Sequence, residues 1–198
     1  MSIIKTHSIT LCRKYKDFEI ALCPLSDKHF PFLYKWNADP EVLYWCEYDD
    51  VKAYSPEIVR QIYGTISKNA LCFIIQVNGM FIGECWLQKM NLPNVTAMYP
   101  AGTDIRRIDM VIGEKEYWGK GLGTQFIKML MDYAFTTEKA DVLHCFSGDY
   151  NIRSIRVWEK NGFKNILIED IANSAKVKQQ YHWRVKKEDY HALLTKIE

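Results

Sequence analysis

Residues 117–124 read YWGKGLGT and carry three glycines at alternate positions. A predicted strand, DIRRIDMVIG at 104–113, comes before this turn, and a predicted helix follows it. The apolar residues of that helix recur at helical spacing: Leu122, Phe126, Ile127, Leu130, Met131 and Ala134. Glycines let a ligand approach the main chain closely, and free N–H groups at the start of a helix bind anions. The turn is therefore a candidate phosphate-binding loop, with a glycine-rich turn made only for tight packing as the alternative.

Two common nucleotide-binding motifs do not fit this turn. A Walker loop needs four residues between its glycines and then Gly-Lys-Ser or Gly-Lys-Thr, whereas Lys120 lies inside the glycine run. A dinucleotide fingerprint needs G-x-G-x-x-G, whereas this sequence has G-x-G-x-G. If the turn binds a phosphate, it belongs to another class of site.

The elements on both sides of the turn predict a single domain over residues 1–198, of the α/β class and layered around a mixed sheet. Further strands are expected at 9–15, 18–25, 71–77, 80–90, 142–146, 166–171 and 178–185. Asn78-Gly79 is a strong signal for a two-residue hairpin between two of them. Further helices are expected at 29–36 with Asp27 as a cap, at 56–69 after Ser55, at 151–163 and at 186–194.

The composition is typical of a globular protein. Apolar residues make up 48% and charged residues 25% of the chain, and the net charge is +2. This balance excludes a disordered chain and does not imply affinity for nucleic acid. No apolar run is long enough to span a bilayer, and the N-terminus lacks the apolar stretch of a secretion signal. The six cysteines form no C-x-x-C pair and the five histidines no H-x-x-x-H spacing. We therefore expect reduced thiols, a cytoplasmic protein without a membrane partner, and no metal site.

A second segment, NIRSIRVWEKNGF at 151–163, adds to the glycine turn. Together the two segments resemble the GNAT superfamily of acetyl-CoA-dependent N-acetyltransferases. The family signature Q/R-x-x-G-x-G/A matches the run from Trp118 to Gly123, except that Trp118 replaces Gln or Arg. The later family pattern N-x-x-[AS]-x-x-x-[YW]-x-[KR]-x-G-F is matched by Asn151, Ser154, Lys160, Gly162 and Phe163.

The resemblance implies a fold and a cofactor. The GNAT fold is an α/β (α+β) fold with a mixed, mostly antiparallel central sheet of about seven strands, flanked by helices and with splayed central strands. The cofactor is acetyl-CoA, whose pyrophosphate is held by backbone N–H groups of the glycine turn and whose pantetheine arm lies along the preceding strand. By the same resemblance, Asn151 would contact the cofactor near its thiol; alternatively, it only caps its helix. The implied cofactor-binding residues are Met110, Val111, Ile112, Trp118, Gly119, Lys120, Gly121, Leu122, Gly123, Thr124, Asn151 and Ser154.

Within the superfamily, the chain is most similar to the aminoglycoside 6′-N-acetyltransferases, which act in antibiotic resistance. The similarity is carried by WNADPEVLYW at 36–45 and by IDMVIGEKEYWGKGLGT at 108–124. It implies a small cationic amine as substrate. The implied substrate-binding residues are Trp36, Asp39, Tyr44, Trp45, Asp109 and Asp149.

The stretch from Trp36 to Val51 fits such a substrate chemically. It holds five acidic residues and no Lys or Arg, with aromatic residues between them. Carboxylates and aromatic faces both attract cations. The alternative is a solvated acidic loop whose aromatic residues turn inward.

Two carboxylates are candidates for the proton transfer that frees the amine for attack on the thioester. Asp109, on the strand before the turn, would hold the ammonium and take its proton directly or through water. The alternative is a structural aspartate paired with Arg107. Glu84, in IGECW, is the second candidate base, and its alternative is a glutamate on an edge strand or at the surface.

Three features depart from the implied family pattern. Trp158 stands where many members have a tyrosine that protonates the leaving thiolate. An Asp-Pro of the aminoglycoside branch is replaced by CFSGDYN, in which Asp149 is displaced, and the net charge of +2 does not favour a polycation. Two other functions therefore stay open: a protein N-terminal acetyltransferase of the ribosomal-protein type, and a non-catalytic acetyl-CoA-binding protein. A monomer and a homodimer are both compatible with the sequence.

Overall fold

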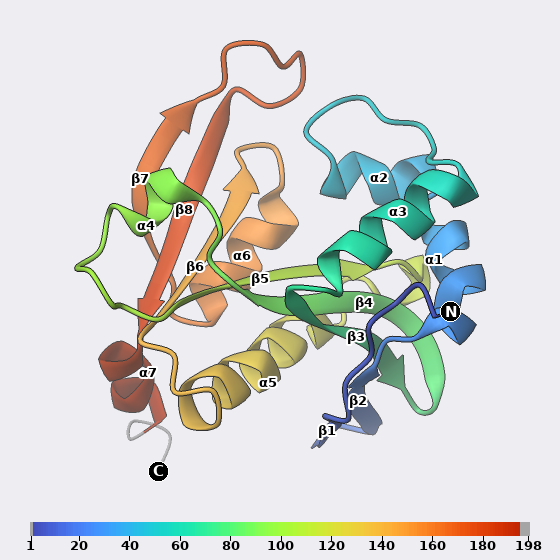
Figure 1. Cartoon of the computed structure of the whole chain (residues 1–198), viewed down its shortest axis with the longest axis horizontal. Coiled ribbons are helices and arrows are strands. Elements are labelled where there is room, and N and C mark those ends of the chain that lie inside the picture. Colours follow the sequence, from blue (N-terminus) through green and yellow to red (C-terminus); the bar gives the residue numbers. More distant parts are fainter. Residues whose placement is uncertain (1, 195–198) are drawn as a thin grey trace. The chain divides into compact units, whose positions relative to one another are not determined.

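The computed structural model describes residues 2–194 and contains an open, mostly antiparallel sheet flanked by helices (Figure 1). The strand order is β1-β2-β3-β4-β5-β6-β8-β7. The strands are β1 (Leu11–Tyr15), β2 (Phe18–Pro24), β3 (Ala70–Val77), β4 (Met80–Lys89), β5 (Ile105–Ile112), β6 (Val142–Gly148), β7 (Lys164–Asp170) and β8 (Gln179–Lys186). The helices are α1 (Phe30–Trp36), α2 (Pro40–Cys46), α3 (Pro56–Ile66), α4 (Pro93–Thr96), α5 (Leu122–Thr136), α6 (Ile152–Lys160) and α7 (Lys187–Leu194), with the 3-10 turns η1 (Asp27–His29) and η2 (Lys115–Tyr117).

The predicted fold class is confirmed, with eight strands in place of about seven. The helices α2 and α4 were not predicted. The predicted cap at Asp27 is wrong, because His29 is the N-cap of α1 and Ser26 is the N-cap of η1. The carboxylate of Asp27 instead accepts the backbone N–H groups of Ile3 at 2.9 Å and Ile4 at 2.8 Å, which ties the N-terminal segment to this turn.

The described chain divides into two compact units. The first runs to Leu87 and includes Asp109–Phe126, and the second holds Gln88–Ile108 and the chain from Ile127 onward. The prediction of a single domain over residues 1–198 stays a prediction, and residues 1 and 195–198 lie outside the described part.

In the first unit, the signals read from the sequence set the borders of the elements. Asn78 and Gly79 both have positive φ, 49° and 79°, as a type I′ turn between β3 and β4 requires. The Ser55 side chain accepts the N–H of Ile58 at 3.4 Å and so caps α3. The buried faces of α1 and α3 meet β3 in one apolar cluster that includes Leu33, Trp36, Val59, Tyr63 and Ile74.

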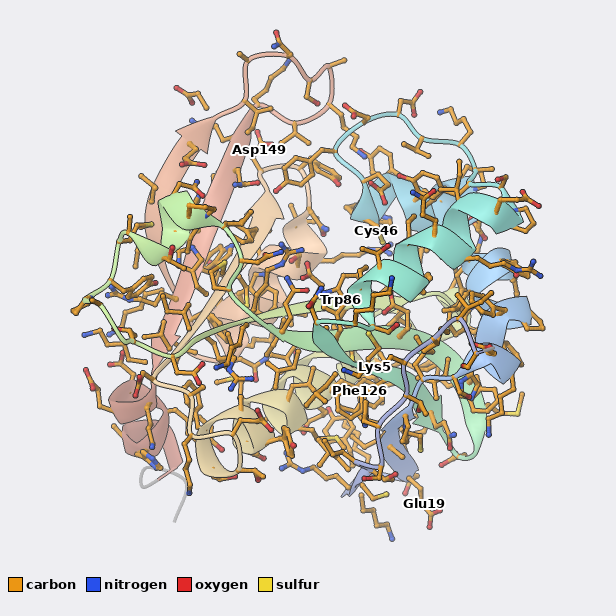
Figure 2. All side chains as sticks on the ribbon, in the orientation of Figure 1. Lys5, Glu19, Cys46, Trp86, Phe126 and Asp149 are labelled. Carbon is orange, nitrogen blue, oxygen red and sulfur yellow. The ribbon has the colours of Figure 1, made fainter. Side chains whose placement is uncertain are left out.

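In the second unit, β5 pairs in parallel with β6 through Ile105 and Val142, at the amino-terminal ends of both strands. β6 and β7 each pair antiparallel with β8, and the β7–β8 register shifts at Asn165 and Leu167. Met90, Val95, Ile105 and Val142 form a small apolar cluster at the start of β5. Figure 2 places Asp149 at the end of β6 in this unit.

A chain of four titratable side chains crosses the second unit. Glu169 contacts Nε2 of His182 at 3.0 Å, Nδ1 of His182 contacts Nε2 of His144 at 3.0 Å, and Nδ1 of His144 contacts the Tyr99 hydroxyl at 2.7 Å. With both rings neutral, every contact has one donor and one acceptor if the protons all point towards Glu169. These contacts are compatible with an uncharged His144, and the burial of this side chain, which is 0% exposed, favours that form.

We expect acid to weaken the fold through His144. Burial, with the nearby His182 and Arg184, lowers the pKa of His144 from 6.5 to about 4. A histidine whose folded pKa is depressed contributes its full stability above pH 6.5 and loses it as the pH falls towards 4. The free energy of unfolding should drop by about 2 kcal/mol from this group between pH 7.5 and pH 5. Urea unfolding of the wild type and of His144→Gln checks this, since the variant should lose that part of the pH dependence. An unchanged dependence in the variant would contradict the assignment.

Two further findings concern the described residues 2–194. None of their helices has both the length and the apolar composition needed to cross a membrane. Their His, Cys, Asp and Glu side chains form no group of three or more that could hold a metal ion.

Candidate active site

The site is built where β5 ends beside β4, within the first unit. The backbone N–H groups of Gly113 and Glu114 both donate to the Ile82 carbonyl, at 2.8 and 3.0 Å. A Cβ atom on Gly83 would lie 2.1 Å from the Val111 carbonyl oxygen, so β5 crosses directly over this glycine. The absence of a side chain at Gly83 is what allows the two strands to approach so closely.

Glu84 lies on β4 next to this crossing and is 1% exposed. The Tyr63 hydroxyl donates to its Oε1 atom at 3.1 Å. Within the described part of the chain, its buried Oε2 atom has no hydrogen-bond partner. The expectation that Glu84 could be a surface or edge-strand residue is wrong, because β4 is flanked by β3 and β5 in the sheet.

Burial raises the pKa of Glu84 to about 8. The hydrogen bond from Tyr63 favours the carboxylate and lowers this pKa, and the negative charge of Asp109 raises it. A carboxylic acid that titrates near neutral pH can accept and release a proton under physiological conditions. Such a shift is typical of acid–base residues in active sites.

Asp109 lies on β5 and is half-buried. The bond from Gly113 N–H to the Ile82 carbonyl, continued in regular antiparallel pairing, brings Trp86 opposite Asp109. The Trp86 indole Nε1 is buried and has no hydrogen-bond partner among the described residues, and Figure 2 places this residue on β4. Glu84 and Asp109 are therefore two carboxylates on adjacent strands whose charges interact.

The glycine turn follows the site along the chain. Gly119 and Gly121 have φ of 73° and 80°, the left-handed region that glycine adopts without strain. A Cβ on Gly119 would meet no atom within 4 Å, so there is open space beside the Cα atom of this glycine. The Trp118 indole N–H donates to the Ile112 carbonyl at 2.7 Å and thereby fastens the turn to the end of β5. Trp118 therefore has a structural role at the position of the expected Gln or Arg.

The turn leads directly into α5, a helix of 15 residues that begins at Leu122. The first N–H groups of a helix have no partner within the helix and carry partial positive charge. Gly123 and Thr124 belong to this first turn, while the Leu122 side chain is buried and anchors it. The residues of the turn therefore fit a phosphate-bearing cofactor, with Lys120 exposed beside them.

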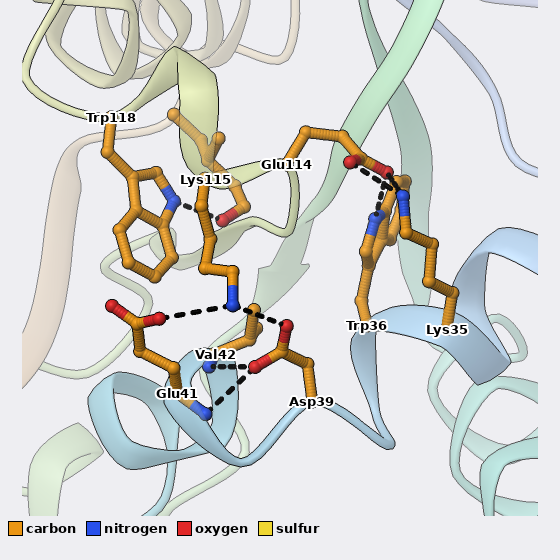
Figure 3. A network of polar contacts seen from close by, with 9 residues as sticks. Lys35, Trp36, Asp39, Glu41, Val42, Glu114, Lys115 and Trp118 are labelled. Atoms are coloured by element: carbon orange, nitrogen blue, oxygen red, sulfur yellow. Dashed lines mark hydrogen bonds and ion pairs between the residues drawn. The ribbon is translucent and has the colours of Figure 1, made fainter.

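A network of ion pairs joins this region to α1 and α2 (Figure 3). Lys115 contacts Asp39 at 2.9 Å and Glu41 at 3.1 Å. Glu114 accepts from Lys35 at 2.6 Å and from the Trp36 indole N–H at 2.9 Å. These contacts hold the segment after β5 against the stretch that was expected to bind substrate.

Two residues of the stretch that was expected to bind substrate have a structural role. Trp36 is 2% exposed and belongs to the core cluster. Asp39 caps α2 by accepting the N–H groups of Glu41 and Val42. Burial alone would raise the pKa of Asp39, but the bonds from Lys115 and from these N–H groups lower it on balance. Their roles towards a substrate stay predictions.

Tyr44 and Trp45 lie on α2. Tyr44 is exposed and Trp45 is half-buried, and their rings meet edge to face with centroids 5.0 Å apart. The expected alternative, a solvated acidic loop with inward aromatic residues, agrees with the structure at the buried Trp36. It does not agree at Pro40–Cys46, which form a helix with Tyr44 on its surface. The pair offers aromatic area of the kind that binds sugar rings or cations.

The remaining predicted residues lie in the second unit. The Asn151 side chain accepts the N–H of Ser154 at 3.0 Å and caps α6, so the capping role expected for it is confirmed. Asp149 accepts the backbone N–H groups of Tyr150 at 3.0 Å and Lys178 at 3.2 Å. Roles of Asn151, Ser154 and Asp149 towards ligands stay predictions.

Comparison with known proteins identifies relatives of this chain. Residues 19–164 match the family model described as the acetyltransferase (GNAT) domain. The aminoglycoside N(6′)-acetyltransferase type 1 of Klebsiella pneumoniae is 22% identical over 149 residues, which are 73% of this chain and 74% of that protein.

Solved structures with the same fold include a spermidine N-acetyltransferase and a protein named RimJ. The spermidine N-acetyltransferase from Vibrio cholerae, in complex with CoA and spermine, has a TM-score of 0.70 and 16% identity, over 87% of this chain and 98% of that chain. RimJ from Mycobacterium smegmatis, in complex with CoA-disulfide, has a TM-score of 0.74 and 14% identity, over 96% of this chain and 95% of that chain. At these identities the similarity shows the fold alone.

Proposed function

Because this chain belongs to the GNAT acetyltransferase family, we propose that it transfers an acetyl group from acetyl-CoA to a primary amine of a small cationic substrate. The 6′-amine of an aminoglycoside is the first candidate, supported by the 22% identity to the Klebsiella pneumoniae enzyme. The observation that carries the proposal is the buried Glu84, whose pKa lies at about 8 beside a second carboxylate, Asp109.

The glycine turn is the proposed cofactor site. When bound, acetyl-CoA supplies the acetyl group as a thioester whose carbonyl carbon the amine can attack. The N–H groups from Gly119 to Thr124 would hold its pyrophosphate, because the turn is open at Gly119 and the positive end of the α5 dipole adds to the attraction. The end of β5, from Met110 to Ile112, would hold the pantetheine arm by main-chain hydrogen bonds.

The two carboxylates have different roles towards the substrate amine. Asp109 holds the substrate ammonium by charge, which places the nitrogen beside the cofactor. Glu84 accepts one proton from that ammonium, because its pKa of about 8 leaves part of it ionised at neutral pH. A main-chain N–H of β5 would then stabilise the oxyanion. Trp158 cannot supply a proton to the leaving thiolate, since an indole N–H is not acidic.

A second candidate function is acetylation of a protein N-terminus. This function is favoured by two ion pairs in the acidic stretch. Asp39 and Glu41 both contact Lys115, so their charges are partly neutralised and attract a polycation less. A peptide N-terminus brings one ammonium and needs fewer carboxylates. The segment NIRSIRVWEKNGF also resembles the corresponding helix of the ribosomal-protein modifying enzymes.

Release of free thiol from acetyl-CoA, measured against a panel of amines, tests the proposal. The panel holds a kanamycin-type aminoglycoside, spermidine and a short peptide with a free N-terminus. We expect steady turnover with the aminoglycoside. Turnover with the peptide alone would select the second function, and binding of acetyl-CoA without turnover of any amine would select the non-catalytic alternative. Whether the protein is a monomer or a homodimer stays a prediction.

A further inference from the structure

A line of hydrogen bonds reaches Glu84 from Asn37, the C-cap of α1, through Tyr63 of α3. The Asn37 side-chain Nδ2 donates to the Leu33 carbonyl at 2.9 Å and to the Tyr63 hydroxyl at 3.3 Å. The Tyr63 hydroxyl contacts Oε1 of Glu84 at 3.1 Å. Tyr63 is 4% exposed, and its ring belongs to the apolar cluster of the first unit.

The direction of these bonds is fixed by chemistry. An amide nitrogen only donates, so the Tyr63 oxygen must accept from Asn37. The single hydroxyl proton of Tyr63 is then directed at Glu84. Oε1 is therefore already engaged as an acceptor, while Oε2 has no partner among residues 2–194 that the structure describes. The two oxygens of the Glu84 carboxylate therefore differ: Oε1 accepts a hydrogen bond from Tyr63, and Oε2 does not.

We infer that Tyr63, itself oriented by Asn37, positions Glu84 for proton acceptance by engaging Oε1 and leaving Oε2 to take the proton of the substrate amine. The inference rests on the proposed function, because it assigns Glu84 as the base. Tyr63 acts through Glu84 and is a positioning residue, not a catalytic one.

The other titratable groups around Glu84 do not replace this donor. Asp109, from β5, interacts with Glu84 as a like charge and raises its pKa. Burial raises the pKa of Cys72, on β3, to about 12 and that of Cys85, on β4, well above its usual range, so both thiols are neutral. Burial also raises the pKa of Tyr63 well above its usual range, so its hydroxyl keeps its proton while Glu84 titrates.

Tyr63→Phe removes the hydroxyl and keeps the ring in the core. Carbon-13 NMR of the full chain, labelled at glutamate carboxyl carbons, follows the titration of Glu84 without any substrate. Glu84→Gln identifies its signal. We expect the midpoint of that signal to rise by about one pH unit in Tyr63→Phe, since a hydrogen bond to the ionised form is lost. An unmoved midpoint would overturn the inference.

Activity provides an independent reading once the panel has identified an amine that turns over. The kcat/KM of Tyr63→Phe should fall about ten-fold at pH 7 and return towards the wild-type value near pH 9.5, because more base is needed to ionise Glu84. A loss that is the same at every pH would indicate damaged packing and would contradict the inference. If no amine turns over but the NMR midpoint still moves, the proposed function fails while the Tyr63–Glu84 coupling stands.

Tyr133→Phe is the matched control. It removes a tyrosine–glutamate hydrogen bond of the same kind, from the Tyr133 hydroxyl to Oε1 of Glu138 at 3.0 Å, in the second unit. The Glu84 midpoint and the pH profile of kcat/KM should not change in this variant. Equal shifts in both tyrosine variants would show a general effect of the substitution and would overturn the role of Tyr63.

Discussion

Replacing Glu84 with Gln should lower kcat by about 100-fold to 10,000-fold with the amine that turns over fastest in the panel. Glutamine keeps the size of the side chain and can still accept from Tyr63, but it cannot take a proton. The acid limb of the pH profile, set by a group with a pKa of about 8, should vanish along with the activity. Steady-state kinetics between pH 6 and 10, with melting temperature as a check on the fold, measure both effects.

Asp109→Asn separates the two carboxylates. If Asp109 holds the ammonium, its loss should raise KM for the amine about ten-fold or more, and the pH profile should still have an acid limb. The limb should also move to lower pH, because the charge of Asp109 raises the pKa of Glu84. Disappearance of the limb in Asp109→Asn, with its survival in Glu84→Gln, would make Asp109 the base and contradict the assignment argued above.

Local signals in the sequence predicted most of the elements. Asn78-Gly79 fixed the β3–β4 hairpin, and Ser55 before Pro56 marked the start of α3. The same rule applied to Asp39 before Pro40 predicts α2, whose cap and first-turn proline have this form. The charged and aromatic residues of that stretch were interpreted as a binding segment, and the start of the helix was therefore not predicted.

The burial of Glu84 could not be predicted from the sequence. IGECW alternates in a way that suits either an edge strand or a central one, and strand order depends on residues far apart in the chain. The partners of Glu84 come from α3 and from β5, so the pair of carboxylates exists only after the sheet has formed. Tyr63 and Asn37 carried no motif that would have marked them.

The segment between β5 and the glycine turn shows how local and long-range constraints combine. The sequence marked the glycines of the turn, but the turn is held by contacts that no motif contains: Trp118 on the Ile112 carbonyl, and Glu114 on Lys35 and Trp36. Lys115 adds the ion pairs to α2. The contacts of Glu114, Lys115 and Trp118 therefore hold the candidate cofactor loop in place without using Gly119.

Gly113→Ala should cost about 3 kcal/mol of folding free energy and lower the melting temperature by roughly 10 °C. A Cβ at this position would lie 2.1 Å from Cγ of Trp36, far inside contact distance. The indole cannot move aside easily, because it is 2% exposed and its N–H is bonded to Glu114. Urea unfolding and thermal melting measure the loss.

Gly102→Ala is the matched control for this prediction, because it separates backbone strain from steric conflict. Gly102 has a φ of 86°, yet nothing lies within 4 Å of a Cβ built on it. Only the left-handed conformation is then costly, by about 1–2 kcal/mol for an alanine. Gly113→Ala should therefore be the more harmful change, although Gly113 is not among the positive-φ glycines. A larger loss of stability in Gly102→Ala than in Gly113→Ala would contradict this prediction. It would mean that β5 shifts away from Trp36 at little cost, and that the indole does not fix the end of the strand on which Asp109 lies.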